Sequence, residues 1–331
     1  MKKFLTPSLS ALASGFASAV ILVSIFSENP FSAVVSFFSS PFASPYFFGS
    51  MLNTSSLLLF ASLGASLALL SGNINLGGEG QVYAGGLITS VILNRFNSFL
   101  SPLAAAVCVI AGCAVLTLIP ALLKIYRRTS ELLSSFLLSA SLIPLIDWAI
   151  ANPLRDKKQN LLATPSIPEQ FTLPSLLPPS KVNISFFIII ALCVVFYILL
   201  YKTRPGSLFR ISGKAREFAQ YSGLPVNKYS ILAMCASGSF HGLCGYFAVT
   251  GMYYTAHQGF YLGMGWNALT VALIAKSHPL LLLPSALLLS YMFTASDYAV
   301  LTNNVSFNMT SIIQASVLLV ISVSKTGRRK S

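Results

Sequence analysis

Long apolar runs separated by short polar segments fill most of this chain. A helix that crosses the hydrocarbon layer of a membrane needs about 20 largely apolar residues, and most of the runs reach that length. We therefore expect about ten transmembrane helices. Their predicted ranges are 8–27, 50–70, 81–98, 102–123, 131–151, 184–201, 229–250, 261–275, 279–296 and 307–324.

The eighth predicted helix is short, and it would merge with the ninth without a break between them. The residues Lys276-Ser277-His278-Pro279 are expected to provide that break, because a lysine, a histidine and a proline make a poor lipid-facing helix interior. An eight-helix chain in which two pairs of runs merge is the alternative. The run at 31–42 is interrupted by proline and is predicted to lie at the membrane interface.

Composition supports the same fold class. Of the 331 residues, 55% are hydrophobic and only 9% are charged, whereas soluble domains are about 25% charged. The chain is predicted to be an all-α polytopic membrane protein, with residues 1–331 forming one transmembrane domain. The apolar run after Lys2-Lys3 continues to Phe26, so it is interpreted as an uncleaved first helix rather than a signal peptide.

The basic residues predict the orientation. With a cytoplasmic N-terminus, the predicted external segments hold only five of the 21 lysines and arginines: Arg95, Arg155, Lys157, Lys158 and Lys181. Positive charge concentrates on the cytoplasmic side of membrane proteins, so both termini are predicted to be cytoplasmic. The net charge of +13 is explained by this bias, and no nucleic-acid partner is expected.

Two loops stand out between the predicted helices. The external loop 152–183 is rich in proline, which favours an extended surface segment. The cytoplasmic loop 202–228 has the densest charge. Within it Lys214–Tyr221 predicts a short helix that Gly223 ends. Such an amphipathic helix either lies on the bilayer or docks into the groove of a partner.

The segment Gly72–Gln81 places polar side chains and four glycines between two apolar runs. Irregular backbone in a membrane is tolerated only where it lines a cavity or is buried in protein. We therefore expect this segment to lie beside a route through the membrane, as part of a translocation path or an inner gate. Its polar members are Asn73, Asn75, Glu79 and Gln81.

Three segments carry a resemblance to a known family. The segment Gly213–Gly223, the later segment Ser237–Gly245 and the Asn73–Gln81 stretch occur in the expected order. Together they resemble the permease subunit of bacterial ABC importers, in the branch that serves simple sugars and nucleosides. That branch has a cytoplasmic signature close to G-x-N-x-x-A-A-x-Y-x-G-I and an N-I-G-x-E-G-Q signature. Here Ala215 replaces the common asparagine, and Leu76-Gly77-Gly78 adds one residue to the spacing.

The resemblance implies a mechanical role in the bacterial cytoplasmic membrane. It implies that the 202–228 loop couples the permease to a separate cytoplasmic ATPase subunit. It also implies a second permease subunit, identical or homologous, and an external substrate-binding protein, among membrane lipids. The solute would be nucleoside-like or sugar-like, with riboflavin or another flat heterocycle as the alternative. The candidate coupling residues are Gly213, Lys214, Arg216, Glu217, Gln220, Tyr221 and Gly223.

The chain itself is not expected to be an enzyme. A nucleotide-binding loop reads G-x-x-x-x-G-K-[ST], but here the upstream Gly206 is too distant and Ala215 replaces the hydroxyl. The histidines and cysteines are scattered, so neither a metal nor a cofactor is expected.

Other interpretations remain open at this stage. Glu79 could be the ion site of a secondary transporter, or a structural carboxylate that caps backbone N–H groups at a broken helix. Asp147 is predicted to be interfacial. The glycines Gly238, Gly242 and Gly245 are expected to let helices pack closely. An aromatic cluster could either anchor the membrane interface or stack on a flat solute: Tyr253, Tyr254, Phe260, Tyr261 and Trp266.

Overall fold

A computed structural model of the chain describes residues 2–26, 29–303, 312 and 314–320. In these residues the regular structure is helical, with one isolated β-bridge between Ala163 and His257, so the predicted all-α class is confirmed. The elements are α1 (Lys2–Phe26), α2 (Pro30–Ser39), η1 (Ser40–Phe42), α3 (Pro45–Leu70), α4 (Gly78–Arg95), α5 (Ser101–Arg127), α6 (Glu131–Ala151), η2 (Glu169–Phe171), α7 (Ser185–Lys202), α8 (Arg204–Lys214), α9 (Arg216–Tyr221), α10 (Val226–Ala248), η3 (Val249–Tyr253), α11 (Met264–Ile274) and α12 (Pro279–Asn303).

Six of the described helices are long and apolar enough to cross a membrane. They are α3, α5, α6, α7, α10 with its η3 extension, and α12. The helix in the eighth predicted range, α11, has only 11 residues and is too short to span. The break predicted at Lys276–Pro279 is present, because α12 starts at Pro279. Much of the tenth predicted range lies outside the described residues.

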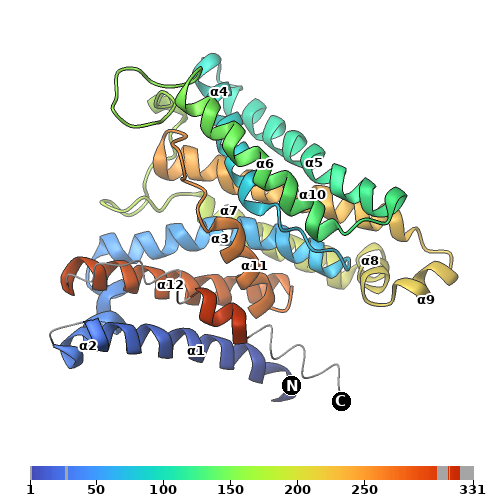
Figure 1. Ribbon diagram of the computed structural model, residues 1–331, viewed down its shortest axis with the longest axis horizontal. Coiled ribbons are helices and arrows are strands. Elements are labelled where there is room, and N and C mark those ends of the chain that lie inside the picture. The colour runs from blue at the N-terminus through green and yellow to red at the C-terminus, as the bar shows by residue number, and fades with distance from the viewer. Residues whose placement is uncertain (1, 27–28, 304–311, 313, 321–331) are drawn as a thin grey trace.

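Helices α3 and α10 form the centre of the bundle (Figure 1). The most apolar part of α3 is 83% buried, compared with 22% for α6 and α7, so α3 is surrounded by protein rather than lipid. Helix α10 packs against α3, α4 and α5. A Cβ at Gly245 would stand 2.0 Å from the carbonyl oxygen of Val82 on α4, and a Cβ at Gly238 would stand 2.3 Å from that of Cys113 on α5.

A small separate core joins the N-terminal helices to α12. Ala19, Phe37 and Met292 are fully buried there. The Tyr291 hydroxyl on α12 donates a hydrogen bond of 2.5 Å to the carbonyl oxygen of Phe38 on α2. This bond fastens α2 to α12, and Figure 1 shows α1 and α2 along one side of the bundle.

The chain leaves helical structure twice inside the bundle. Residues 71–77 are non-helical between α3 and α4, with a turn at Ser71 and Gly72 in which Gly72 has φ +75°. Residues 254–263 connect η3 to the short α11, and both Gly259 (φ +78°) and Gly263 (φ +79°) adopt left-handed backbone. Glycine is favoured at such positions because it has no Cβ to clash. We call these parts of the chain the extended stretch (71–77) and the descending segment (254–263).

The two conspicuous loops lie at opposite ends of the bundle. Figure 1 shows the segment 152–184 at one end and α8 with α9 at the other. The proline-rich segment is held against η3 and the descending segment by backbone bonds. Leu173 donates to the carbonyl oxygen of Thr250 (2.9 Å), and Ile167 donates to that of Tyr254 (2.8 Å).

Candidate functional site

Asn75 and Gln81 form a buried pair of amide side chains. Asn75 Nδ2 donates to Gln81 Oε1 (2.9 Å), and Gln81 Nε2 donates back to Asn75 Oδ1 (3.1 Å). Asn75 Nδ2 also donates to the hydroxyl of Ser237 on α10 (3.0 Å), and Asn75 Oδ1 accepts from the backbone N–H of Gly77. The two amides therefore fasten the extended stretch to α4 and α10.

Two serines of α6 hold the other side of the stretch. The Ser135 hydroxyl accepts from the backbone N–H of Leu76 (3.1 Å), and the Ser139 hydroxyl accepts from that of Gly80 (2.8 Å). These N–H groups stand at or near the start of α4, where a helix has no carbonyl partners of its own to offer. Ser139 lies two turns into α6. The first turn of α4 therefore lies about 12 Å along α6 from the N-terminal end of that helix at Glu131.

Glu79 joins the two helix breaks. Its Oε1 accepts a hydrogen bond from the backbone N–H of Gly263 (2.9 Å), and the N–H of Trp266 also donates to this carboxylate. A Cβ at Gly265 would stand 2.5 Å from the backbone nitrogen of Glu79, so the two chains touch there through backbone atoms. The carboxylate thus caps the N-terminus of α11, where the helix dipole favours negative charge.

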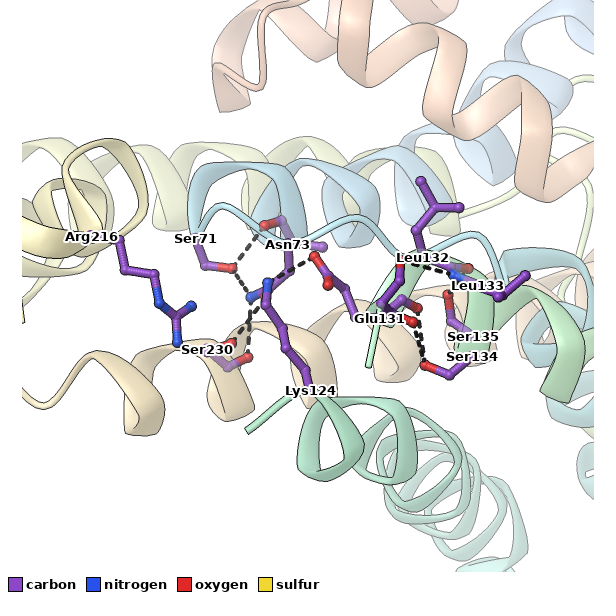
Figure 2. A network of polar contacts seen from close by, with 12 residues as sticks. Ser71, Asn73, Lys124, Glu131, Leu132, Leu133, Ser134, Ser135, Arg216 and Ser230 are labelled. Carbon is purple, nitrogen blue, oxygen red and sulfur yellow. Dashed lines mark hydrogen bonds and ion pairs between the residues drawn. The ribbon is translucent and has the colours of Figure 1, made fainter. Parts of the chain in front are cut away.

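Asn73 lies in a polar network at the end of the bundle near α8 and α9 (Figure 2). Its Oδ1 accepts from Lys124 Nζ (2.7 Å) and from the Ser230 hydroxyl (3.0 Å), while its Nδ2 donates to the Ser71 hydroxyl (2.6 Å). Lys124 also pairs with Glu131 at 2.8 Å, and both side chains are largely buried. The network joins α3, α5, α6 and α10 at one point.

The 202–228 loop contacts this region directly. A Cβ at Gly213, near the end of α8, would stand 2.0 Å from the carbonyl oxygen of Leu70, and a Cβ at Gly72 would stand 2.8 Å from that of Gly213. The backbone of α8 therefore rests on the residues where α3 ends and the extended stretch starts. The aromatic rings of Phe209 and Tyr229 pack edge to face and fix α8 on α10.

The single helix expected over Lys214–Tyr221 is wrong in one respect. Helix α8 continues to Lys214, the chain bends at Ala215, and α9 starts at Arg216. The predicted end at Gly223 is present: its φ is +74°, and the N–H of Leu224 bonds to the carbonyl of Ala219 (2.9 Å). Nothing stands within 4 Å of a Cβ built at Gly223, so this turn faces open space.

The candidate coupling residues lie mostly on one exposed surface. Tyr221 is 93% exposed and Phe218 is 65% exposed, although both are large aromatic side chains. Arg216 is partly buried and donates to Asn227 Oδ1 (3.1 Å). Within the described chain the other residues of this set point to solvent or line the turn: Lys214, Glu217, Gln220 and Gly223.

The predicted aromatic cluster lies along the descending segment, together with Tyr83 of α4. The rings of Tyr83 and Tyr261 are 4.5 Å apart, and Phe260 packs edge to face on Tyr83 at 5.4 Å. The Tyr83 hydroxyl donates to Asp147 Oδ1 at 2.5 Å. Asp147, one turn before the end of α6, is therefore bonded within the protein.

Sequence reasoning did not single out Lys124, Glu131 or Ser230 as site residues. Lys124 belongs to the basic residues that the charge bias assigns to the cytoplasmic side, and a lysine at a helix end gives that same signal whether or not it has a partner. The described residues contain no group of three or more metal-ligating side chains.

The matching family model is that of the branched-chain amino acid transport system, permease component, and it covers residues 47–322. Three relatives span nearly the whole chain. The probable riboflavin import permease RfuC of Treponema pallidum (strain Nichols) is 36% identical over 97% of this chain and 86% of the relative. The nucleoside ABC transporter permease NupB of Lactococcus lactis subsp. cremoris (strain MG1363) is 26% identical over 97% and 91%, and the guanosine ABC transporter permease NupP of Bacillus subtilis (strain 168) is 22% identical over 96% and 92%.

These matches and the six apolar helices establish a multi-pass protein of the cytoplasmic membrane. The resemblance to the sugar and nucleoside branch of ABC permeases is confirmed.

The network around Asn73 yields a stability prediction. Lys124→Met would leave the Glu131 carboxylate largely buried without its cation and remove a donor from Asn73, at a cost of about 3 kcal/mol. Glu131→Gln keeps an oxygen that can accept from Lys124 and should cost only about 1 kcal/mol. Thermal unfolding of the purified protein in detergent should therefore rank wild type above Glu131→Gln and Glu131→Gln above Lys124→Met.

The exposed Lys228 at the start of α10 supplies the matched control. Lys228→Met should unfold with the wild-type midpoint. A Lys124→Met protein that also unfolds with the wild-type midpoint would show that the network does not hold these helices together.

Proposed function

We propose that this chain, which belongs to the family of permease components described above, is the membrane subunit of an ATP-driven importer. Its solute would be flavin-like or nucleoside-like. Its relatives are ABC permease subunits, which carry no catalytic site. ATP hydrolysis would then take place on a separate cytoplasmic subunit.

One contact carries the mechanical part of this proposal. The backbone of Gly213 in α8 rests against Leu70 and Gly72, at the start of the extended stretch. A force on α9 would pass through α8 into this stretch, and from there to Asn75 and Glu79. The extended stretch is therefore proposed as the inner gate, with Asn73, Asn75, Glu79 and Gln81 as the side chains that hold it.

The exposed surface of α9 is the proposed docking element for the ATPase. Solvent-exposed tyrosine and phenylalanine on a short helix are typical of anchors that insert into a partner's groove. The segment 202–228 is thus the coupling loop, and its contact residues would be Lys214, Arg216, Glu217, Gln220 and Tyr221, with Gly213 and Gly223 shaping the backbone.

The proposed orientation follows from this assignment. Placing α8 and α9 in the cytoplasm puts segment 152–184 outside, because Figure 1 shows them at opposite ends. Ten membrane-associated helices with cytoplasmic termini fit that orientation, and α11 would enter from the cytoplasmic side only part of the way. A second permease, identical or homologous, would cover α5 or α6, whose faces hold many exposed apolar residues.

An external binding protein would deliver the solute. On the proposed external side, Arg95 and Arg155 line a cavity of about 490 Å³ with polar Asn94 and Thr164. Neither arginine forms an ion pair with a carboxylate within the described part of the chain. Acidic side chains of a binding protein would complement this surface.

A flavin-like heterocycle is the preferred solute. The riboflavin permease is 36% identical to this chain, compared with 26% and 22% for the two nucleoside permeases. This reverses the order expected from sequence motifs, which favoured nucleosides and sugars. The aromatic side chains along the descending segment suit a flat ring. An ion-coupled transporter would not need the exposed α9 surface.

The coupling proposal can be tested with single substitutions in α9. Tyr221→Ala and Glu217→Arg should each reduce co-purification with the ATPase subunit at least tenfold, because they remove an anchor or reverse a charge on the docking surface. ATP-dependent uptake into vesicles should fall with it. Tyr126→Ala provides the control, since Tyr126 is 76% exposed at the proposed cytoplasmic end of α5 but lies outside the loop. Unchanged co-purification and uptake in both α9 variants would rule out this loop as the coupling element.

The solute can be identified by uptake. Proteoliposomes that contain the permease, its ATPase and its binding protein should accumulate riboflavin only when ATP is supplied, with guanosine and glucose as comparison solutes. Accumulation driven by an ion gradient without ATP would contradict an ATP-driven importer. Accumulation of guanosine but not riboflavin would reverse the choice of solute.

A further inference from the structure

The descending segment runs deep beside α4. Near its start, the N–H of Ala256 bonds to the Thr164 hydroxyl, which in turn contacts Ser90 of α4. At its end, the N–H of Gly263 bonds to Glu79. Ser90 and Glu79 are three helical turns apart, so this non-helical segment descends about 16 Å along α4.

One side of this segment is not covered by the part of the chain that the structure describes. Leu262, next to its deep end, is 71% exposed. Non-helical backbone at membrane depth is tolerated only where it is buried in protein or lines a water-filled cavity. The open side near Leu262 therefore faces another subunit or the solute route, and not lipid.

Asn267 presents an unsatisfied amide next to this open side. It lies one turn into α11 and is only 8% exposed, yet its Oδ1 has no hydrogen-bond partner. Its Nδ2 would stand 3.1 Å from a Cβ built at Gly263, the residue that Glu79 binds. A buried acceptor without a partner is costly, and a ligand with an N–H or O–H group would satisfy it.

Asp147 offers a second acceptor higher along the segment. Tyr83 occupies its Oδ1, and Gln258 Nε2 donates to its backbone carbonyl oxygen (3.0 Å), which fixes the position of Asp147 beside the segment. Its Oδ2 has no hydrogen-bond partner in the described part of the chain. A carboxylate oxygen accepts hydrogen bonds only, so it selects groups that donate.

The two carboxylates also give this region a negative potential. Tyr83, which binds Asp147, lies one helical turn from Glu79 on α4, so the two carboxylates flank the same part of the segment. Lys124 and Glu131 form the only ion pair between residues that the structure describes, so neither carboxylate has a cationic partner there. In a low-dielectric surrounding, such a potential strongly opposes the entry of an anion.

We propose that Asn267 and Asp147 contact the solute along the descending segment, and that Asp147 with Glu79 restricts transport to neutral solutes rich in N–H and O–H groups. This inference rests on the proposed import function and adds its selectivity. Riboflavin and guanosine fit this class, and their phosphate esters do not.

Measuring solute binding to the permease itself tests this inference independently of delivery by the external binding protein. The permease–ATPase complex, purified without the binding protein, is titrated with riboflavin and with riboflavin 5′-phosphate, and quenching of flavin fluorescence reports binding. Wild type should bind riboflavin 5′-phosphate at least tenfold more weakly than riboflavin. Asn267→Ala should weaken riboflavin binding about tenfold, the factor that corresponds to 1.4 kcal/mol. Asp147→Asn should bring the two affinities closer together.

Two variants outside the segment serve as matched controls. Asn160→Ala removes an exposed amide and Glu169→Gln neutralises an exposed carboxylate, both in the 152–184 segment. Neither should change the two affinities. Asp147→Asn retains an acceptor for Tyr83, so this variant should elute from a sizing column like wild type.

The possible failures can be distinguished. Equal affinity of wild type for riboflavin and its phosphate ester, or no effect of Asn267→Ala and Asp147→Asn, overturns the inference while leaving the import function intact. If guanosine binds but riboflavin does not, the same variants are compared with guanosine and its monophosphate, with the same expectations. If wild type binds neither flavin, nucleoside nor glucose, the proposed function fails and the inference fails with it.

Discussion

The structure depends on how backbone groups are satisfied where two helices are broken inside the bundle. A bilayer supplies no water to an unpaired N–H or C=O, so each break needs partners from the protein. The Glu79 carboxylate supplies them for α11, and it stands in the first turn of α4. Glu79 thus supplies partners at the end of the break before α11, and it also stands in the helix that follows the break between α3 and α4. The approach of Gly265 to the Glu79 backbone leaves no room for a larger residue.

This arrangement links the two ends of the molecule. On one side, Gly213 contacts the start of the extended stretch, and the amide pair of Asn75 and Gln81 fixes its middle. On the other side, the descending segment reaches Glu79 from the end that holds the proline-rich segment. Motion of α8 and α9 would therefore act on the same residues that border the proposed solute route. The exchange of a few hydrogen bonds could open the route without unfolding a helix.

Hydropathy predicted most of the helices, because burial in lipid leaves a strong and continuous signal. The predicted range 131–151 coincides with α6, and 184–201 differs from α7 by one residue at each end. The motifs around Glu79 and Gly223 also located the family. The sequence was a weaker guide where contacts between distant residues determine the local structure. Neither the bend at Ala215 nor the bond between Tyr83 and Asp147 has a local signal, since each depends on residues distant in the chain. The depth of the 254–263 segment was likewise not predicted, because its aromatic residues resemble interfacial anchors.

Of the two surroundings that suit the open side of the descending segment, another subunit or the solute route, we propose the solute route. Cysteine accessibility tests it directly, with Leu262→Cys in a chain whose five native cysteines are replaced by alanine or serine. In membranes that contain the assembled transporter, a membrane-impermeant thiol reagent should modify this cysteine, and saturating riboflavin should slow the reaction. Leu145→Cys, on the exposed apolar face of α6, should stay unreactive. A Leu262→Cys protein that is as unreactive as Leu145→Cys would contradict the account.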